Sequence, residues 1–209
     1  MRAGHLPLVV LISGRGSNLK AILDAVARDL PVEVRCVISN RPGAGGLALA
    51  REAGVATEVV DHTDYASRES FDEALGARID HYTPGLVVLA GFMRVLGPWF
   101  VRRYAGRLVN IHPALLPAFP GLHTHERALE AGVAEHGASV HFVTEEVDGG
   151  PVILQARVPV LPGDTPEALA ARVLEQEHRI YPQAIRWFAD GRLRLEGDRV
   201  LLDGKPVAP

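Results

Sequence analysis

Short apolar runs alternate with amphipathic helical stretches through the first half of the chain, and this alternation restricts the possible folds more than any other feature. The first run, residues 8–12, is short, branched and unbroken by polar residues, as buried parallel strands are. Further strands are expected at residues 34–38, 57–60, 86–90 and 108–111, and helices at 19–28, 47–53, 70–82 and 99–104. Such alternation predicts an α/β fold with a doubly wound, mostly parallel sheet.

The pattern changes after about residue 137. Strands expected at 139–144 and 152–160 have no helix between them, so they should pair antiparallel. A long helical pattern over 166–190 contains Pro182, which we expect to kink or split it, and residues 192–207 read as a hairpin turning at 197–198. We expect one domain, 1–209, in which residues 113–209 extend the sheet of residues 1–112.

Charge and composition exclude several classes of protein. The 22 basic and 25 acidic residues give a net charge of −3, whereas nucleic-acid-binding proteins are normally basic. The single cysteine, Cys36, excludes an internal disulfide and a cysteine-based zinc site. Apolar runs such as 86–90 are too short to span a bilayer, and residues 1–7 lack the apolar core of a signal peptide. We therefore expect a cytoplasmic protein without membrane or nucleic-acid partners.

A glycine-rich loop, residues 13–18, joins the first expected strand to the first expected helix. Free backbone N–H groups and the helix dipole favour an anion there, and Ser17 and Asn18 can donate from their side chains. Leu19 replaces the third glycine of the dinucleotide fingerprint, which argues against NAD, although Arg41 would suit the 2′-phosphate of NADP. The loop fits a single phosphate monoester best, and the alternative is a plain tight turn.

Two polar side chains share one face at the end of the fifth expected strand. Asn110 and His112 alternate with Ile111, so both point to the same side of the sheet. A histidine can carry a proton near neutral pH, and an amide N–H can donate to an oxyanion. Asp148, in a glycine-rich turn, is the best candidate to orient the imidazole; alternatively it is a solvated turn residue. Three prolines follow by residue 120 and should make this loop rigid, and one X-Pro bond there could be cis.

Two other features of the sequence could form binding sites. Glu177 lies on the apolar stripe of the long helix, where a carboxylate needs a partner or a ligand hydroxyl; the alternative is a boundary residue that reaches solvent. His123 and His125 are two positions apart in what reads as a proline-rich loop, and no acidic residue has obvious ligand spacing. We therefore expect no metal site.

Several separated motifs, in order, resemble those of the folate-dependent phosphoribosylglycinamide formyltransferases over nearly the whole chain. They are VLISGRGSN (10–18), LAGFMR (89–94), NIHPALLP (110–117), PGLHTH (120–125), HGASVHFV (136–143), DGGPVILQ (148–155) and QEH (176–178). The resemblance implies a Rossmann-like formyltransferase fold. It also implies that residues 1–112 form a phosphate-binding half and residues 113–209 a folate-binding half.

The resemblance implies roles for individual residues. Asn110, His112 and Asp148 would be catalytic; Gly16, Ser17 and Asn18 would hold the substrate phosphate, and Glu177 the ribose hydroxyls. The folate pocket would be formed by Arg68, Met93, Arg94, Val95, Leu96, Asn110, Val143, Thr144 and Val147. Leu174 stands where some relatives carry a polar residue near the phosphate, which weakens the case for a further side-chain contact there.

The chemistry implied is transfer of the formyl group of 10-formyltetrahydrofolate to the amine of 5′-phosphoribosylglycinamide in purine biosynthesis. The amine would attack the formyl carbon, and His112, kept protonated by Asp148, would stabilise the oxyanion together with Asn110. The enzyme would act on small molecules, without a metal, as a monomer or homodimer.

Four other functions compete with this reading. A formyltetrahydrofolate deformylase would use water as the acceptor, but typically carries a regulatory domain before the catalytic part. A methionyl-tRNA formyltransferase would need a further carboxyl-terminal domain and a basic surface. An NADP-dependent reductase using Arg41 and a non-catalytic sugar-phosphate binder are the remaining alternatives.

Overall fold

A computed structural model describes residues 4–207 of the chain. These residues form two compact units that divide between Val109 and Asn110. The division lies within strand β5 (Leu108–His112), so the residues at the end of this strand belong to the second unit.

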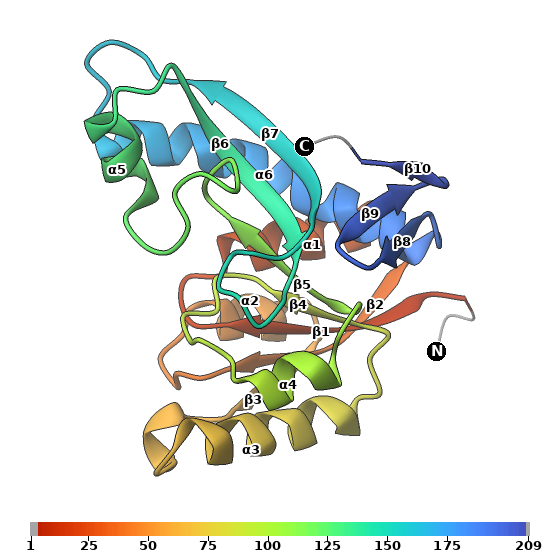
Figure 1. Ribbon diagram of the computed structural model, residues 1–209. Coiled ribbons are helices and arrows are strands. Elements are labelled where there is room, and N and C mark those ends of the chain that lie inside the picture. Colours follow the sequence, from red (N-terminus) through yellow and green to blue (C-terminus); the bar gives the residue numbers. More distant parts are fainter. Residues whose placement is uncertain (1–3, 208–209) are drawn as a thin grey trace. The chain divides into compact units, whose positions relative to one another are not determined.

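The amino-terminal unit is built of alternating strands and helices (Figure 1). It contains β1 (Leu6–Ile12), α1 (Ser17–Arg28), β2 (Val32–Ser39), α2 (Gly46–Glu52), β3 (Ala56–Val59), the 3₁₀ helix η1 (His62–Asp64), α3 (Arg68–His81), β4 (Leu86–Leu89) and α4 (Pro98–Arg103). The strands run parallel in the order β3-β2-β1-β4. Residues 8–12 of β1 and all of β4 are fully buried, which explains why both read as unbroken apolar runs.

Chain direction places the helices of this unit in two layers. The chain moves outward from β1 to β3 and then returns to β4 beside β1. Because crossovers are right-handed, this reversal puts α1 and α2 on one face of the sheet and α3 and α4 on the other. The members of each pair contact one another, as Figure 1 shows. The loops after β1 and β4 therefore part in opposite directions, which creates a topological switch point between these two strands.

The carboxyl-terminal unit combines an antiparallel pair with one long helix. After β5 it contains α5 (Thr124–Glu130), β6 (Glu135–Phe142), β7 (Val152–Pro159), α6 (Pro166–Ala189), β8 (Leu193–Glu196), β9 (Arg199–Leu202) and β10 (Lys205–Pro206). Helix α6 packs against both β6 and β7. The last three strands form a small antiparallel sheet, whose β8–β9 turn falls at residues 197–198 as expected. Parallel strands with an added antiparallel pair confirm the expected fold class.

The structure contradicts one of the two outcomes that the sequence predicts for Pro182, a split of the helix. Helix α6 is continuous from Pro166 to Ala189 and is not split at this proline. Proline removes one helical hydrogen bond, but Ile180, Tyr181, Ala184 and Ile185 on either side of it are all buried. Burial of this apolar face keeps the helix whole across the missing bond.

The segment between β5 and β6 also differs from expectation. The sequence predicts a proline-rich loop at residues 123–125, but α5 begins at Thr124, so His125 is helical. Strand β6 begins at Glu135, four residues before the expected start, because Glu135 to Ser139 continue the antiparallel register with β7. The Leu116–Pro117 peptide bond is cis.

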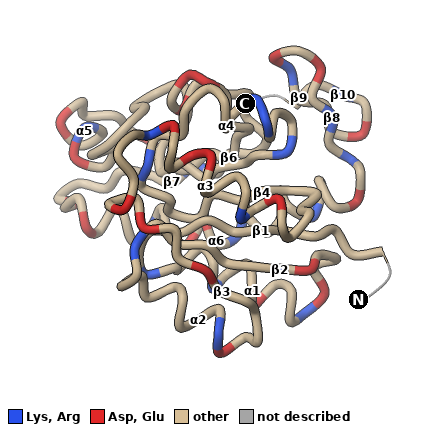
Figure 2. Tube along the Cα trace, turned by 90° about the horizontal axis from the view of Figure 1, so that it is seen from below, with Lys and Arg blue, Asp and Glu red and all other residues tan. Residues whose placement is uncertain are grey.

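The distribution of charged residues and the hydropathy of the helices agree with the composition of the chain. Figure 2 shows basic and acidic residues intermixed along the chain, in keeping with the net charge of −3. Within residues 4–207, no helix combines the length and the apolar character that crossing a membrane requires.

Candidate active site

In the amino-terminal unit, two loops meet at the switch point between β1 and β4. Ser13, directly after β1, donates its backbone N–H to the carbonyl of Gly91 at 3.1 Å. Its hydroxyl accepts a hydrogen bond from the backbone N–H of Met93 at 2.7 Å and donates to Asn40 Oδ1 at 2.5 Å. One buried serine therefore joins the ends of three strands. Ligands of open α/β sheets bind at this edge.

The glycine loop lies at the start of α1, as expected. Gly16 caps the helix with a φ of 80°, and a Cβ built on it would lie 2.6 Å from Gly46 Cα. Only glycine fits this backbone and this approach. Ser17 and Asn18 are the first residues of α1, where backbone N–H groups have no carbonyl partner within the helix. This arrangement can hold a phosphate group.

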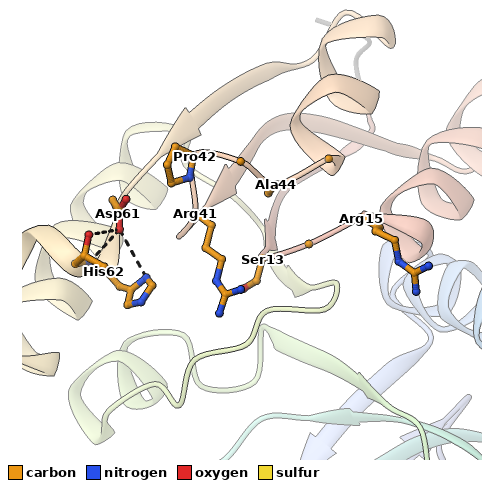
Figure 3. A pocket seen from close by; sticks show the side chains of 11 residues that line it. Ser13, Arg15, Arg41, Pro42, Ala44, Asp61 and His62 are labelled. Carbon is orange, nitrogen blue, oxygen red and sulfur yellow. Dashed lines mark hydrogen bonds and ion pairs between the residues drawn. The ribbon is translucent and has the colours of Figure 1, made fainter.

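A cavity of about 540 Å³ lies beside this loop in the same unit (Figure 3). It is lined by the loops that follow β1, β2 and β3, among them Ser13, Arg41, Asp61 and His62. Figure 3 shows the Arg41 side chain reaching into the space between Ser13 and His62. Arg41 thus stands beside the glycine loop, where the NADP reading requires it. Leu19 still occupies the place of the third fingerprint glycine.

The loop between β4 and α4, residues 90–97, presents apolar side chains to its surroundings. Met93 and Val95 are 57% and 56% exposed, whereas Leu96 is buried. The Arg94 guanidinium lies 5.8 Å from the centre of the Phe71 ring, and Arg68 begins α3 nearby. Exposed apolar groups next to two arginines suit a flat ring system that carries carboxylates.

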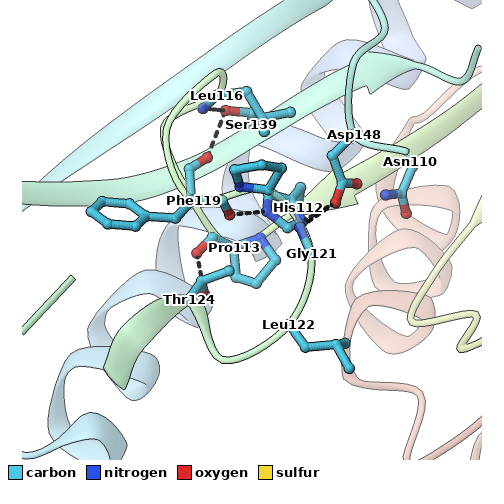
Figure 4. A network of polar contacts seen from close by, with 12 residues as sticks. Asn110, His112, Pro113, Leu116, Phe119, Gly121, Leu122, Thr124, Ser139 and Asp148 are labelled. Carbon is cyan, nitrogen blue, oxygen red and sulfur yellow. Dashed lines mark hydrogen bonds and ion pairs between the residues drawn. The ribbon is translucent and has the colours of Figure 1, made fainter. Parts of the chain in front are cut away.

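In the carboxyl-terminal unit, the imidazole of His112 and the carboxylate of Asp148 lie together (Figure 4). His112 Nδ1 is 3.5 Å from Asp148 Oδ2, and His112 Nε2 donates to the carbonyl of Phe119 at 2.9 Å. Gly121 N–H donates to the same Asp148 Oδ2 at 2.8 Å. Both ring nitrogens of His112 therefore face oxygen acceptors. The backbone of Asp148 is left-handed, with a φ of 55°, a strained conformation typical of functional turns.

The chain that follows β5 is braced by polar side chains of β6 and β7. Ser139 donates from its hydroxyl to the carbonyl of Ala114 at 2.7 Å and accepts from the N–H of Leu116 at 3.0 Å. The Gln155 amide donates to the Leu116 carbonyl at 2.9 Å and to the Ser139 hydroxyl at 2.8 Å. Thr124 closes the segment by donating to the Pro113 carbonyl at 2.8 Å. These bonds fix the Phe119 carbonyl opposite His112.

His141 has no role predicted from the sequence, and the structure places it beside Asn110. It is 2% exposed, its Nδ1 lies 2.9 Å from the Phe142 carbonyl, and its Nε2 is 3.3 Å from Asn110 Nδ2. Burial lowers its pKa, against the opposing effects of the Phe142 carbonyl and Asp148. A neutral ring with the proton on Nδ1 fits both contacts, because Nε2 then accepts one Asn110 N–H. Within residues 4–207 the second amide N–H has no protein acceptor, so it can donate to a ligand.

The remaining candidates lie in the same two units. Val143 and Thr144 follow β6 and are half-buried, whereas Val147 is exposed in the loop that leads to Asp148. Glu177 is 7% exposed on α6, among the buried residues expected from the helical pattern, so it is not a boundary residue that reaches solvent. Among residues 4–207, no group of three or more His, Cys, Asp or Glu side chains could hold a metal ion.

Comparison with known proteins gives a consistent result. Residues 6–185 match the family model described as formyl transferase. Phosphoribosylglycinamide formyltransferase of Escherichia coli K12 is 57% identical over 97% of this chain and 96% of its own length. The Coxiella burnetii enzyme of the same name, solved in complex with CHES, has a TM-score of 0.95 at 54% identity, covering 98% of this chain and 96% of its own. Glycinamide ribonucleotide transformylase 1 of Symbiobacterium toebii has a TM-score of 0.93 at 51% identity, covering 96% and 95%.

Proposed function

The chain belongs to the formyl transferase family, and from this premise we propose that it is a phosphoribosylglycinamide formyltransferase of purine biosynthesis. It transfers the formyl group of 10-formyltetrahydrofolate, its co-substrate, to the amine of 5′-phosphoribosylglycinamide. The observation that carries this proposal is 57% identity to an enzyme of that activity along almost the full length of both chains.

The reaction is an acyl transfer in which no enzyme nucleophile is required. The substrate amine attacks the formyl carbon, and the carbonyl oxygen becomes an oxyanion in the tetrahedral intermediate. The intermediate collapses by breaking the bond to the folate nitrogen, which gains a proton while the attacking amine loses one. The enzyme must therefore stabilise one oxyanion and move one proton.

We propose that His112 and Asn110 stabilise the oxyanion, and that Asp148 orients the imidazole of His112. Asp148 faces one nitrogen of the imidazole and the Phe119 carbonyl accepts from the other, so both contacts hold the ring in one orientation. His141 Nε2 accepts a hydrogen bond from one N–H of the Asn110 amide, and this contact orients the second N–H toward the oxyanion. A water bound by Asp148 would carry the proton from the amine to the folate nitrogen.

The substrates would be held by the groups at the two strand edges. We assign the phosphate to Gly16, Ser17 and Asn18 at the start of α1, and the ribose hydroxyls to Glu177. The folate would contact Arg68, residues 93–96, Asn110, Val143, Thr144 and Val147. We further infer that the enzyme acts in the cytoplasm, as a monomer or a homodimer.

One assay tests the transferase against its nearest rival, a formyltetrahydrofolate deformylase. The protein is mixed with 10-formyltetrahydrofolate, with and without phosphoribosylglycinamide, and loss of the formyl group is followed. Loss that depends on the amine, with one formylated product per folate consumed, is the expected result. Equal loss without the amine would identify a hydrolase instead.

A further inference from the structure

Helix α3 buries a carboxylate that the mechanism above does not use. Asp72 is only 2% exposed, although it lies on a helix rich in charged residues. Its Oδ2 accepts a hydrogen bond from the backbone N–H of Gly97 at 2.6 Å. Among the described residues, its Oδ1 has no hydrogen-bond partner. Burying a carboxylate with only one hydrogen-bonded oxygen lowers the free energy of unfolding. The contact that accompanies this loss of stability is the hydrogen bond to one backbone N–H.

That backbone group ends the loop to which we assign the folate. Gly97 closes residues 90–97 and caps α4. A Cβ built on Gly97 would lie 2.7 Å from Asp72 Oδ2 and 3.9 Å from Arg68 Cδ, so the loop lies directly on α3. The φ of Gly97 is −76°, an ordinary value, which means that close approach and not backbone strain requires glycine here.

The neighbours of Asp72 on α3 contact the same loop. Arg68 and Phe71 precede it by four and one positions, and Arg94 of the loop stacks over the Phe71 ring. Burial raises the pKa of the Asp72 carboxyl and nearby Glu69 raises it further, while the Gly97 N–H, Arg68 and Arg94 act in the opposite direction. The carboxylate therefore lies within the electrostatic reach of both arginines assigned to the folate site.

Beyond Gly91, the loop is thus held by two further hydrogen bonds. Ser13 accepts from the Met93 N–H near its middle, and Asp72 accepts from the Gly97 N–H at its end. Between the two contacts lie Arg94, Val95 and Leu96. A segment of three residues fixed at both ends has few conformations left, so the exposed side chains of this loop are presented in one arrangement.

We propose that Asp72 is a positioning residue for the co-substrate: by holding Gly97 it fixes residues 93–96 in the shape that binds the folate. This rests on the proposed function, which assigns those residues to the folate site. Asp72 itself touches no substrate. Its loss should therefore weaken folate binding and leave the chemical step and the binding of the amine substrate unaltered.

The test separates the two Michaelis constants. Asp72→Ala removes the acceptor, and we expect KM for 10-formyltetrahydrofolate to rise about 10-fold to 100-fold, the range for a lost hydrogen bond to a charged group. KM for phosphoribosylglycinamide and kcat at saturation should change less than about threefold, within the scatter of a neutral substitution. Asp72→Asn keeps an oxygen acceptor for Gly97 and should recover most of the lost folate affinity.

Two further variants make the result specific. Gly97→Ala places a methyl group against Asp72 Oδ2 and should raise the same KM from the loop side. Leu75→Ala is the matched control, because Leu75 is fully buried on the same helix and its truncation destabilises the fold without removing a contact to Gly97. It should lower the melting temperature but leave KM for the folate unchanged.

The outcomes are distinguishable. An unchanged folate KM in Asp72→Ala, an equal rise in both Michaelis constants, or a similar rise in Leu75→Ala would overturn the positioning role. If the wild-type protein shows no formyl transfer, the proposed function fails, and hydrogen exchange still tests the loop. Amides of residues 91–97 should exchange faster in Asp72→Ala than in wild type while those of β1 do not, and equal exchange would again refute the proposal.

Discussion

His112 Nδ1 and Asp148 Oδ2 lie 3.5 Å apart, although one ends a strand and the other lies in a distant turn. The pair is closed on its other sides by backbone groups, with the Phe119 carbonyl at His112 and the Gly121 N–H at Asp148. Both of these groups belong to the single segment that follows β5. The same loop therefore positions both His112 and Asp148, so the catalytic geometry depends on the conformation of that loop.

Replacing the carboxylate tests this pairing directly. Asp148→Asn keeps an oxygen that can accept from Gly121 but removes the negative charge that faces His112 Nδ1. We expect formyl transfer to fall roughly 10²–10⁴-fold in this variant and also in His112→Ala, the range for loss of a positioned acid or base. Steady-state rates with both substrates saturating measure the effect. Unfolding curves close to wild type serve as the control, and near-wild-type activity in both variants would contradict the assignment.

A second prediction concerns the energetic coupling between Asn110 and His141, which are in contact. His141→Ala frees the Asn110 amide to rotate, and we expect kcat to fall about tenfold, which corresponds to one ordinary hydrogen bond. Asn110→Ala should cost more, because it removes the donor itself. If His141 acts only through Asn110, the double variant is no slower than Asn110→Ala. Fully multiplicative losses in this double-mutant cycle would show that His141 acts independently.

Much of the fold was predictable because buried segments can be recognised by their apolar side chains. The buried strand segments 8–12 and β4 consist of apolar residues alone, so they stand out from the segments around them. Helix α5 gives no such signal, because only Thr124 and Ala128 are buried in it. The helix is not split at Pro182, because apolar packing on both sides of it outweighs local propensity.

The candidate site was predictable in its residue types and less so in its contacts. Asn110 and His112 share a face through strand alternation alone, which any reader of the sequence can deduce. The neutral partner His141 depends on the register of β6, and the Phe119 carbonyl depends on the path of a loop that has no periodic pattern. Asp72 is one of many charged residues on α3, and only the folded helix shows which of them faces inward.

A third prediction concerns the buried histidine His136 and the dependence of the unfolding free energy on pH. Burial lowers the pKa of His136 from 6.5 to about 4, and nearby His125 and His112 act in the same direction. Between these values the unfolded chain binds a proton that the folded chain does not, so the free energy of unfolding falls as the pH falls from 6.5 toward 4. The loss is on the order of 3 kcal/mol at most.

Urea unfolding at pH 7 and pH 4.5 measures this effect. His136→Leu removes the titrating group and should lose less stability between the two pH values than wild type does. His81→Leu, which replaces a histidine on α3, is the control and should follow the wild-type dependence. Equal losses in wild type and His136→Leu would show that other groups cause the acid sensitivity.

The glycine loop allows a matched pair of substitutions two residues apart. Gly16→Ala puts a Cβ on a left-handed backbone and 2.6 Å from Gly46 Cα, so α1 and α2 must separate or the loop must change shape. We expect a loss of more than about 1 kcal/mol in unfolding free energy and a higher KM for phosphoribosylglycinamide, because the phosphate-binding N–H groups move with the loop. Gly14→Ala meets no atom within 4 Å and should change the unfolding free energy by less than about 0.5 kcal/mol. Thermal unfolding and substrate titration of both variants give the comparison, and an unchanged KM in a destabilised Gly16→Ala enzyme would separate this loop from the phosphate.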